Sequence, residues 1–283
     1  GQEGGAACGA RSPAEGRAPW APAPAVRRGA MAEEEGTQEV TNVVVAVRAR
    51  PMNKRETEEG ATLAVEFHNT EQLSITTSKG EASQFAFDHI FPSTTPQGAV
   101  FDKLGVALLD KAFHGFNSTI FAYGQTGSGK THTMLNHKAD ADNRGLIPRI
   151  ADSLYARIAE ETAKHETRKF LVCCSFMEIY NEIIFDLLVA RKNQPKGGLE
   201  VKEQKGLGVY VKDLQEMVIE TSEKLQNVLE KGFEHRQTAS TKMNDVSSRS
   251  HCIFVIKLHQ KDTEDGTKNT FSKLNLVDLA GSE

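Results

Sequence analysis

The sequence has few cysteines and no long apolar run. Its 283 residues include four cysteines, Cys8, Cys173, Cys174 and Cys252, and none forms a C-x-x-C pair. This spacing does not match a zinc site or a disulfide framework, and the adjacent pair lies in an apolar stretch, so we expect buried thiols in a reducing, intracellular compartment. Since no apolar run approaches the roughly 18 to 20 residues that cross a bilayer, we expect a soluble protein without a transmembrane segment.

The chain also lacks a large excess of charge of either sign. Lys and Arg total 34 against 38 Asp and Glu, which gives a formal net charge of -4. Bulk charge therefore does not indicate a nucleic-acid partner, although a local basic face remains compatible with the composition. With 39% hydrophobic residues, the length suits one large domain or two small ones with a sizeable core.

The first 39 residues differ in composition from the rest. Gly, Ala and Pro supply 19 of the first 30 residues, so this stretch has too little large apolar surface to offset the entropy of ordering it. We predict a disordered leader over 1–39 and a folded domain that begins near Val40. Glu3 and Glu15 disfavour a transit peptide, and Met31 is the simpler natural start.

Four stretches after Val40 predict strands that are apolar on both faces: "VTNVVVAVRARP" (40–51), "FLVCCSFMEIY" (170–180), "HCIFVIKLH" (251–259) and "KLNLVDLAG" (273–281). Between them, apolar residues recur at helical spacing around Leu104 and Leu225. The alternation predicts an α/β fold with a central mainly parallel or mixed sheet and helices on both faces. "LAVEF" (63–67) and "QLSITT" (72–77) predict a small peripheral hairpin.

The strongest local signal is "TIFAYGQTGSGKTHTM" (119–134), where an apolar strand runs into a glycine-rich loop and then a helical pattern. Gly124, Gly127 and Gly129 allow the backbone to wrap a phosphate chain, and the following helix adds the positive end of its dipole. Lys130 would reach the outer phosphates, and Thr131 a magnesium ion. A glycine-rich turn that matches by chance is the alternative, and the flanking strand argues against it.

Two further stretches fit a triphosphate site. "NDVSSRSH" (244–251) places hydroxyls, a guanidinium and an imidazole before a strand, as a loop over a γ-phosphate would require. A serine-rich surface turn is an equally good interpretation of this stretch alone. "DLAGSE" (278–283) places an acid at the end of an apolar strand, followed by a glycine whose N–H could meet the γ-phosphate, but D-x-x-G alone is a weak signal.

Taken together, these stretches resemble the kinesin motor domain family. "RARP" (48–51) is similar to the adenine-binding motif of that family, "FAYGQTGSGKTHTM" to its P-loop, "NDVSSRSH" to its switch I and "VDLAGSE" to its switch II. "GLIPRI", "FMEIYNEIIFDLL" and "LGVYVKDL" extend the resemblance, and other details resemble the vesicle-transport branch that bears forkhead-associated domains. The resemblance implies a P-loop NTPase motor domain over 40–283 that ends at switch II and lacks its C-terminal part.

The resemblance implies ATP and Mg²⁺ as cofactors and assigns residues to each part of the site. The adenine and ribose would be bound by Arg48, Arg50, Pro51 and His132, and the phosphates by Gly124, Gln125, Thr126, Gly127, Ser128, Gly129, Lys130 and Thr131. The metal would be held by Thr131, Ser248 and Asp278. Hydrolysis would depend on Ser247, Ser248, Arg249, Gly281 and Glu283. Arg249 and Glu283 would pair across the two switches. We interpret His251 as a packed histidine rather than a catalytic one.

In function, the resemblance implies ATP hydrolysis coupled to movement along microtubules, with tubulin as partner and the cytoplasm and microtubule cytoskeleton as location. Hydrolysis is the expectation for a complete domain, and we expect this chain to be an incomplete product. The alternative is a non-motile nucleotide-binding or microtubule-associated interaction protein that keeps half of a motor domain. A generic P-loop ATPase or an actin motor fits less well, because "SSRSH" is followed by "DLAGSE".

Overall fold

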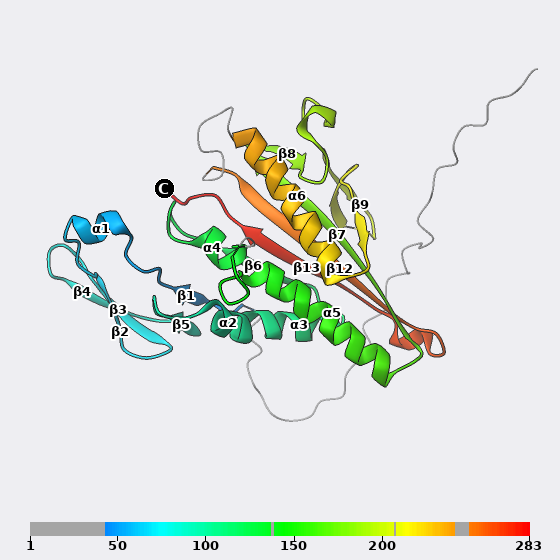
Figure 1. Ribbon diagram of the computed structural model, residues 1–283, viewed down its shortest axis with the longest axis horizontal. Coiled ribbons are helices and arrows are strands. Elements are labelled where there is room, and N and C mark those ends of the chain that lie inside the picture. The colour runs from blue at the N-terminus through cyan, green and yellow to red at the C-terminus, as the bar shows by residue number, and fades with distance from the viewer. Residues whose placement is uncertain (1–42, 137–138, 207, 241–248) are drawn as a thin grey trace, which may run out of the picture.

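The computed structural model describes residues 43–136, 139–206, 208–240 and 249–283 (Figure 1). The predicted leader over 1–39 and the candidate residues Ser247 and Ser248 lie outside these ranges. A six-stranded sheet forms the centre of the described chain. Its order is β11 (Met217–Ile219), β7 (Arg168–Tyr180), β12 (His251–Asp262), β13 (Thr270–Asp278) and β6 (Ser118–Ala122), and β8 (Ile183–Asp186) pairs with β7.

The sheet is mixed, as the sequence predicts, but it is not mainly parallel. Within it, β13 pairs with β6 in parallel, and the other pairings are antiparallel. The reason is local for β12 and β13, because the stretch between them closes as a turn around a short 3₁₀ helix (Gly266–Lys268). There the Asp265 side chain accepts a hydrogen bond from the Thr267 N–H. A short turn joins antiparallel neighbours, whereas a parallel pair needs a long crossover.

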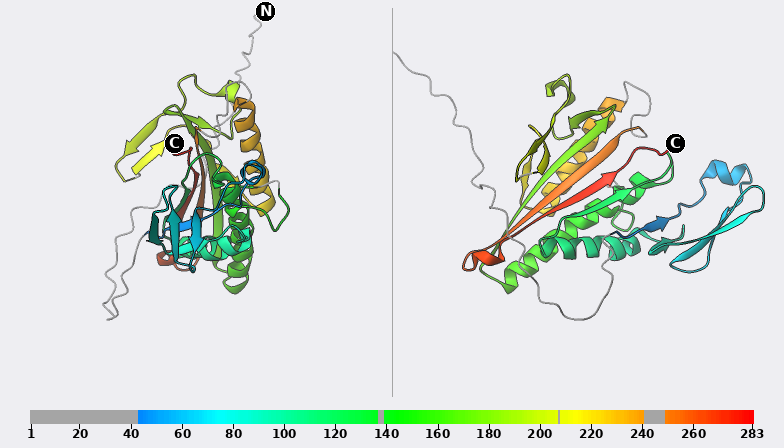
Figure 2. Two further views of the ribbon diagram at one scale, coloured as in Figure 1. Left: turned by 90° about the vertical axis from the view of Figure 1, so that its left-hand side faces the viewer. Right: turned by 180° about the vertical axis from the view of Figure 1, so that it is seen from behind.

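Helices α3 (Val106–Phe113), α5 (Leu146–Lys164) and α6 (Ser222–Ser240) cover one face of this sheet (Figure 2). Alternate strand residues on that face, such as Phe254 and Leu274, are fully buried. On the opposite face, Phe121, Phe271 and Val218 keep 62%, 45% and 46% of their surface exposed. In the described part of the chain, the expectation of helices on both faces is therefore met on one face.

A short run leads into α3, consisting of α2 (Gln97–Val100) and a π-helical turn (Phe101–Gly105). Helix α4 (Lys130–Met134) lies between β6 and α5. Outside the main sheet, β1 (Ala46–Arg48) pairs in parallel with β5 (His89–Phe91). None of the helices in the described ranges is both long enough and apolar enough to span a bilayer.

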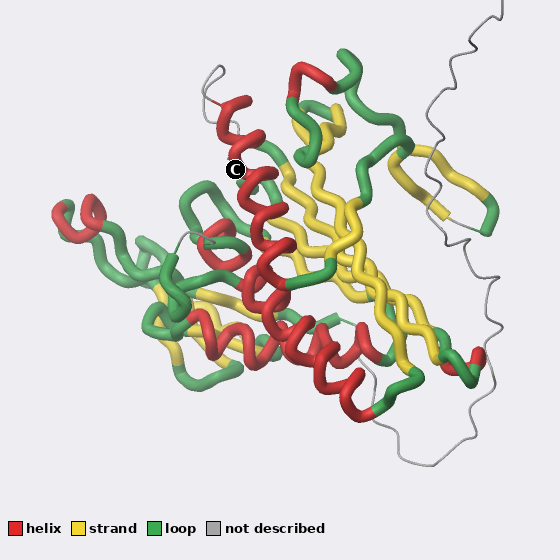
Figure 3. Tube along the Cα trace, turned by 45° about the vertical axis from the view of Figure 1, so that its right-hand side comes forward, coloured by secondary structure: helices red, strands yellow, loops and turns green. Residues whose placement is uncertain are grey.

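The predicted peripheral hairpin is present and gains a third strand. β2 (Val65–Phe67), β3 (Gln72–Thr76) and β4 (Ala82–Ala86) form an antiparallel sheet, and with α1 (Lys54–Glu58) they make a lobe beside the domain (Figure 1). A second hairpin, β9 (Val201–Gln204) and β10 (Gly208–Val211), projects from the other end of the molecule (Figure 3). A 3₁₀ turn (Arg191–Asn193) precedes it.

The three described cysteines, Cys173, Cys174 and Cys252, are free and buried, as predicted. Burial raises the pKa of the Cys252 thiol to about 12, so the thiol stays protonated at neutral pH. These side chains therefore act as small apolar residues of the sheet.

The centre of the core is an aromatic cluster around Phe176. Its ring is fully buried, and its centroid lies 5.2 Å from those of Phe233 and Phe254, both in edge-to-face geometry. Helix α6 approaches this closely because Gly232 has no side chain: a Cβ there would lie 2.2 Å from a Phe176 ring atom. Strands β7 and β12 and helix α6 therefore meet at one ring.

We expect Phe176→Ala to destabilise the fold by about 3 to 5 kcal/mol, because the lost contacts leave a cavity between sheet and helix. Phe116→Ala is the matched control, since Phe116 is 64% exposed, and should change the free energy of unfolding by less than about 0.5 kcal/mol. Urea denaturation measures both. Equal effects at the two positions would contradict this description of the core.

Candidate functional site

The parallel pairing of β6 and β13 brings two distant segments to one edge of the sheet. The register places Asp278 beside Ala122, at the carboxyl ends of both strands. Backbone bonds continue the contact beyond the strands, from Leu279 N to Ala122 O (3.3 Å) and from Ser282 N to Gly124 O (3.2 Å). The carboxyl edge of such strands is where ligands bind in α/β sheets.

The loop between β6 and α4 has the backbone that the sequence predicts. Gly124, Gly127 and Gly129 have φ values of 148°, 78° and 97°. At Gly124, a Cβ would lie 2.8 Å from Ser128 Oγ, so both the conformation and the space select glycine. Gly129 is left-handed and caps α4, whose free N–H groups face the loop. The arrangement provides backbone donors for a phosphate chain.

Lys130 is held at this loop by its own backbone. Its Nζ donates to Gly124 O at 2.8 Å and to Gln125 O at 3.0 Å. These bonds fold the side chain back over the loop, so its positive charge lies where the loop would receive a phosphate.

Thr131 and Asp278 meet across the two segments. Thr131 Oγ1 donates to Asp278 Oδ2 at 2.6 Å. The Asp278 carboxylate is 3% exposed, and within the described ranges its Oδ1 has no hydrogen-bond partner. Burial raises the pKa of Asp278, and the Thr131 hydrogen bond and the charges of Arg236 and Lys130 oppose that shift. A buried carboxylate with a free oxygen beside a hydroxyl fits Mg²⁺, which prefers oxygen ligands.

The four residues predicted for the adenine end lie together. Arg48, Arg50, Pro51 and His132 border a groove of about 640 Å³, lined by residues 48–53, 93–97, 127–129, 132, 133 and 143. The groove includes part of the glycine loop, so the base end and the phosphate end are continuous. Its volume is in the range of small-molecule sites.

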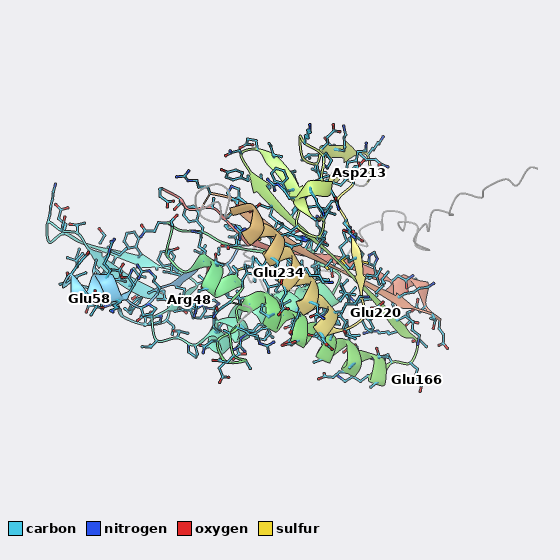
Figure 4. The ribbon with its side chains drawn as sticks, turned by 45° about the horizontal axis from the view of Figure 1, so that its top comes forward. Arg48, Glu58, Glu166, Asp213, Glu220 and Glu234 are labelled. Atoms are coloured by element: carbon cyan, nitrogen blue, oxygen red, sulfur yellow. The ribbon has the colours of Figure 1, made fainter. Side chains whose placement is uncertain are left out.

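The two arginines of the groove are held differently. Arg50 forms a two-pronged ion pair with Glu56, whose pKa falls to about 2 because of that contact. Glu56 is fixed in turn by the capping box of α1, in which Asn53 and Glu56 each accept the other's backbone N–H. Arg48 reaches α4 instead, where it donates to Thr133 Oγ1 at 3.0 Å. Figure 4 labels the position of Arg48.

Arg48 is held by three residues that were not predicted from the sequence: Thr95, Gln97 and Thr133. Arg48 donates to Gln97 Oε1 at 2.7 Å and to the Thr95 carbonyl at 3.3 Å. Burial lowers the pKa of Arg48 and, together with the charge of Arg48, that of His132, so the imidazole is neutral at pH 7. No motif marks these partners, because they are close to Arg48 only in space.

Glu283 and Gly281 lie against the glycine loop. Glu283 Oε1 accepts from the Thr126 N–H at 3.1 Å. A Cβ at Gly281 would lie 2.1 Å from Glu283 Oε2 and 2.4 Å from Thr126 Oγ1, so a side chain here would require the Glu283 and Thr126 side chains to move. Arg249 lies in an exposed turn, and no ion pair joins it to Glu283 among the described residues. The structure therefore does not bring this predicted pair together.

His251 has a structural partner. Its Nδ1 accepts the backbone N–H of Ala280 at 3.1 Å. The bond ties the start of β12 to the segment that follows β13. This contact supports the interpretation of His251 as a packed histidine.

A buried ion pair lies beside the site. Arg236 of α6 donates to Glu178 Oε1 at 3.1 Å and to Ser250 Oγ at 3.1 Å, and Ser250 Oγ donates to Glu178 Oε1 at 2.7 Å. Glu178 is 1% exposed and Arg236 is 6% exposed. The triad ties β7, α6 and the residue before β12 together, next to Asp278.

The strand, the Gly124-to-Thr131 loop, the helix and the facing Asp278 define a nucleotide-binding domain of the P-loop class. The kinesin motor domain family profile matches residues 48–283. The chain belongs to this family.

Individual relatives agree with this family assignment. The chain is 43% identical over 264 residues to the kinesin-like protein KIF13A of Mus musculus, covering 86% of this chain and 14% of the relative. It is 41% identical over 244 residues to the kinesin heavy chain of Botryotinia fuckeliana, covering 86% and 27%. The chain thus spans about a quarter or less of the length of these relatives. Their similar identities do not single out a branch of the family, so the vesicle-transport branch stays a prediction.

A solved structure shares the fold. It is that of a fast kinesin, described with its ATPase mechanism and its interactions with microtubules. The TM-score is 0.78 at 39% sequence identity, covering 85% of this chain and 66% of that one. The predicted α/β motor-domain fold is confirmed.

We expect Glu178→Ala to lower the free energy of unfolding by about 3 to 5 kcal/mol, because the buried Arg236 guanidinium loses its compensating carboxylate. Replacing both residues by Met should cost less than the single change. The exposed pair Lys54–Glu58 is the control, and its removal should cost less than about 1 kcal/mol. A double-mutant cycle by urea denaturation measures the coupling, and a double variant no more stable than Glu178→Ala would contradict the prediction.

Proposed function

We propose that this chain provides the nucleotide site of a kinesin motor domain, which in the full-length protein binds ATP with Mg²⁺ and couples its hydrolysis to movement along microtubules. The 2.6 Å contact between Thr131 and Asp278 carries the proposal. It joins the loop that would hold the phosphates to the acid of the second segment, as a P-loop magnesium site requires.

Each part of the ligand is assigned to a set of residues. The glycine loop from Gly124 to Thr131 would bind the phosphates through backbone N–H groups and Lys130. Thr131, Asp278 and Ser248 would hold Mg²⁺, which supplies charge stabilisation of the phosphates when bound. The groove at Arg48, Arg50, Pro51 and His132 would take the adenosine part.

The remaining roles concern hydrolysis. We assign Ser247 to the γ-phosphate and the attacking water, Ser248 to the magnesium ion that supports hydrolysis, and the Gly281 N–H to the γ-phosphate. Arg249 and Glu283 would pair when the triphosphate is bound. Phosphoryl transfer needs positioning and electrostatic stabilisation rather than a covalent intermediate, so this set requires no side-chain nucleophile.

Microtubules are the proposed partner, with the microtubule cytoskeleton of the cytoplasm as location. Family membership supports both. Lysines on and after the β9–β10 hairpin, Lys202, Lys205 and Lys212, offer local positive charge for an acidic surface, although Lys202 also pairs with Glu200 at 2.6 Å. The alternative is a non-motile interaction protein that binds nucleotide without microtubule-stimulated turnover. Phosphate release from the purified full-length protein, with and without microtubules, separates the two.

Lys130→Ala should weaken ATP binding at least about tenfold and abolish turnover, because a charge-assisted contact to the phosphates is lost. Titration with a fluorescent ATP analogue and a phosphate-release assay measure the two effects. Lys111→Ala, an exposed lysine of α3, is the control and should change neither. Near-normal turnover of Lys130→Ala would exclude the assignment of the phosphate loop.

Arg249→Ala should keep nucleotide binding and lose hydrolysis, because its pairing with Glu283 belongs to the triphosphate-bound state. A cycle with Glu283→Ala should show a coupling energy of about 0.5 to 3 kcal/mol in the activation free energy. Single-turnover hydrolysis measures it. Additive losses would mean that the two residues act separately.

A further inference from the structure

Gln97 is a buried polar residue at the edge of the groove. Its side chain is 2% exposed, at the start of α2 and directly after Pro96. Its Oε1 accepts from Arg48 Nη1 at 2.7 Å, and its Nε2 donates to the His132 carbonyl at 2.7 Å and to the Asn143 carbonyl at 3.3 Å. The same Nε2 lies 3.3 Å from His132 Nδ1.

These contacts join four segments of the chain, each of which contributes a residue to the wall of the groove. Arg48 ends β1, Gln97 begins α2, His132 lies on α4 and Asn143 precedes α5. All four residues line the groove. One carboxamide thus fixes the relative positions of the walls of the adenine end.

The bonding pattern of Gln97 needs both halves of the amide. The oxygen must accept from a guanidinium, and the nitrogen must donate to two carbonyls on other segments. A carboxylate of the same shape could still accept from Arg48, but it would face the two carbonyls without a proton to donate. An alanine would leave all three partners without this group.

Gln260 is a second buried glutamine with which Gln97 can be compared. Gln260, near the far end of β12, is 7% exposed, and its Nε2 donates to the Phe113 carbonyl at 2.9 Å and to Thr270 Oγ1 at 2.8 Å. It satisfies buried polar groups away from the groove. Gln97 differs in that its partners are the groove residues themselves.

We propose that Gln97 is a positioning residue for base recognition: it holds Arg48 and His132 at the spacing that accepts the adenine end of the ligand, and so sets how much the base adds to the affinity of the phosphate loop. The proposal rests on the proposed nucleotide-binding function. Gln97 acts through its neighbours, so the binding of a ligand without a base does not depend on it.

The test compares ATP with inorganic tripolyphosphate, which carries the phosphates without adenosine. Isothermal titration calorimetry on the purified protein, in the presence of Mg²⁺, gives both dissociation constants for the wild type, Gln97→Ala, Gln97→Glu and Gln260→Ala. The ratio of the two constants measures the contribution of the base. Thermal unfolding of each variant gives its melting temperature and so shows how far the substitution destabilises the fold.

Gln97→Ala and Gln97→Glu should bind ATP about ten- to a hundredfold more weakly and tripolyphosphate within about twofold of the wild type. Gln260→Ala should lower the melting temperature without changing the ratio. A folded Gln97 variant whose ratio of ATP to tripolyphosphate dissociation constants equals that of the wild type would overturn the inference. A merely structural role would give this result, because it would weaken the binding of both ligands equally. If Gln97→Ala fails to fold, Gln97→Glu decides. If the wild type binds neither ATP nor tripolyphosphate, the proposed function itself is excluded.

Discussion

The site depends on the parallel pairing of β6 with β13. This pairing sets Ala122 beside Asp278 in register, so the loop after one strand and the acid at the end of the other begin from the same edge. The Thr131–Asp278 hydrogen bond and the contact of Glu283 with Thr126 follow from it. A slip of one residue would turn the Asp278 side chain to the other face of the sheet, away from α4.

The base end is built on a different set of contacts. Arg48 ends a short strand outside the central sheet, and hydrogen bonds to α2, α4 and the Thr95 carbonyl hold its guanidinium. Arg50 depends instead on α1, through Glu56. The phosphate end is therefore fixed by strand register, and the base end by side-chain networks among short elements.

The sequence was sufficient to predict the part of the site whose residues form one continuous motif. The glycine loop, Lys130 and Thr131 form one motif, and the structure gives them the backbone that the motif predicts. Contacts between distant segments were not predictable where no motif marks the residue, as Gln97 shows, since its partners are 35 to 49 residues away along the chain. The sequence also left a mainly parallel and a mixed sheet both open, because apolar runs of this kind do not distinguish a parallel strand from a buried antiparallel one.

The two bonds of Lys130 to the carbonyls of Gly124 and Gln125 use two of the three protons of its ammonium. A phosphate that accepts more than one proton from this lysine would have to replace a carbonyl partner, so for that contact only the difference between the two partners would contribute to affinity. A singly charged anion offers little beyond two well-placed carbonyls, whereas a polyphosphate adds several charged oxygens and the loop N–H groups together. On the proposed function, the self-bonded lysine would therefore favour polyanions over the simple anions that surround the protein in solution.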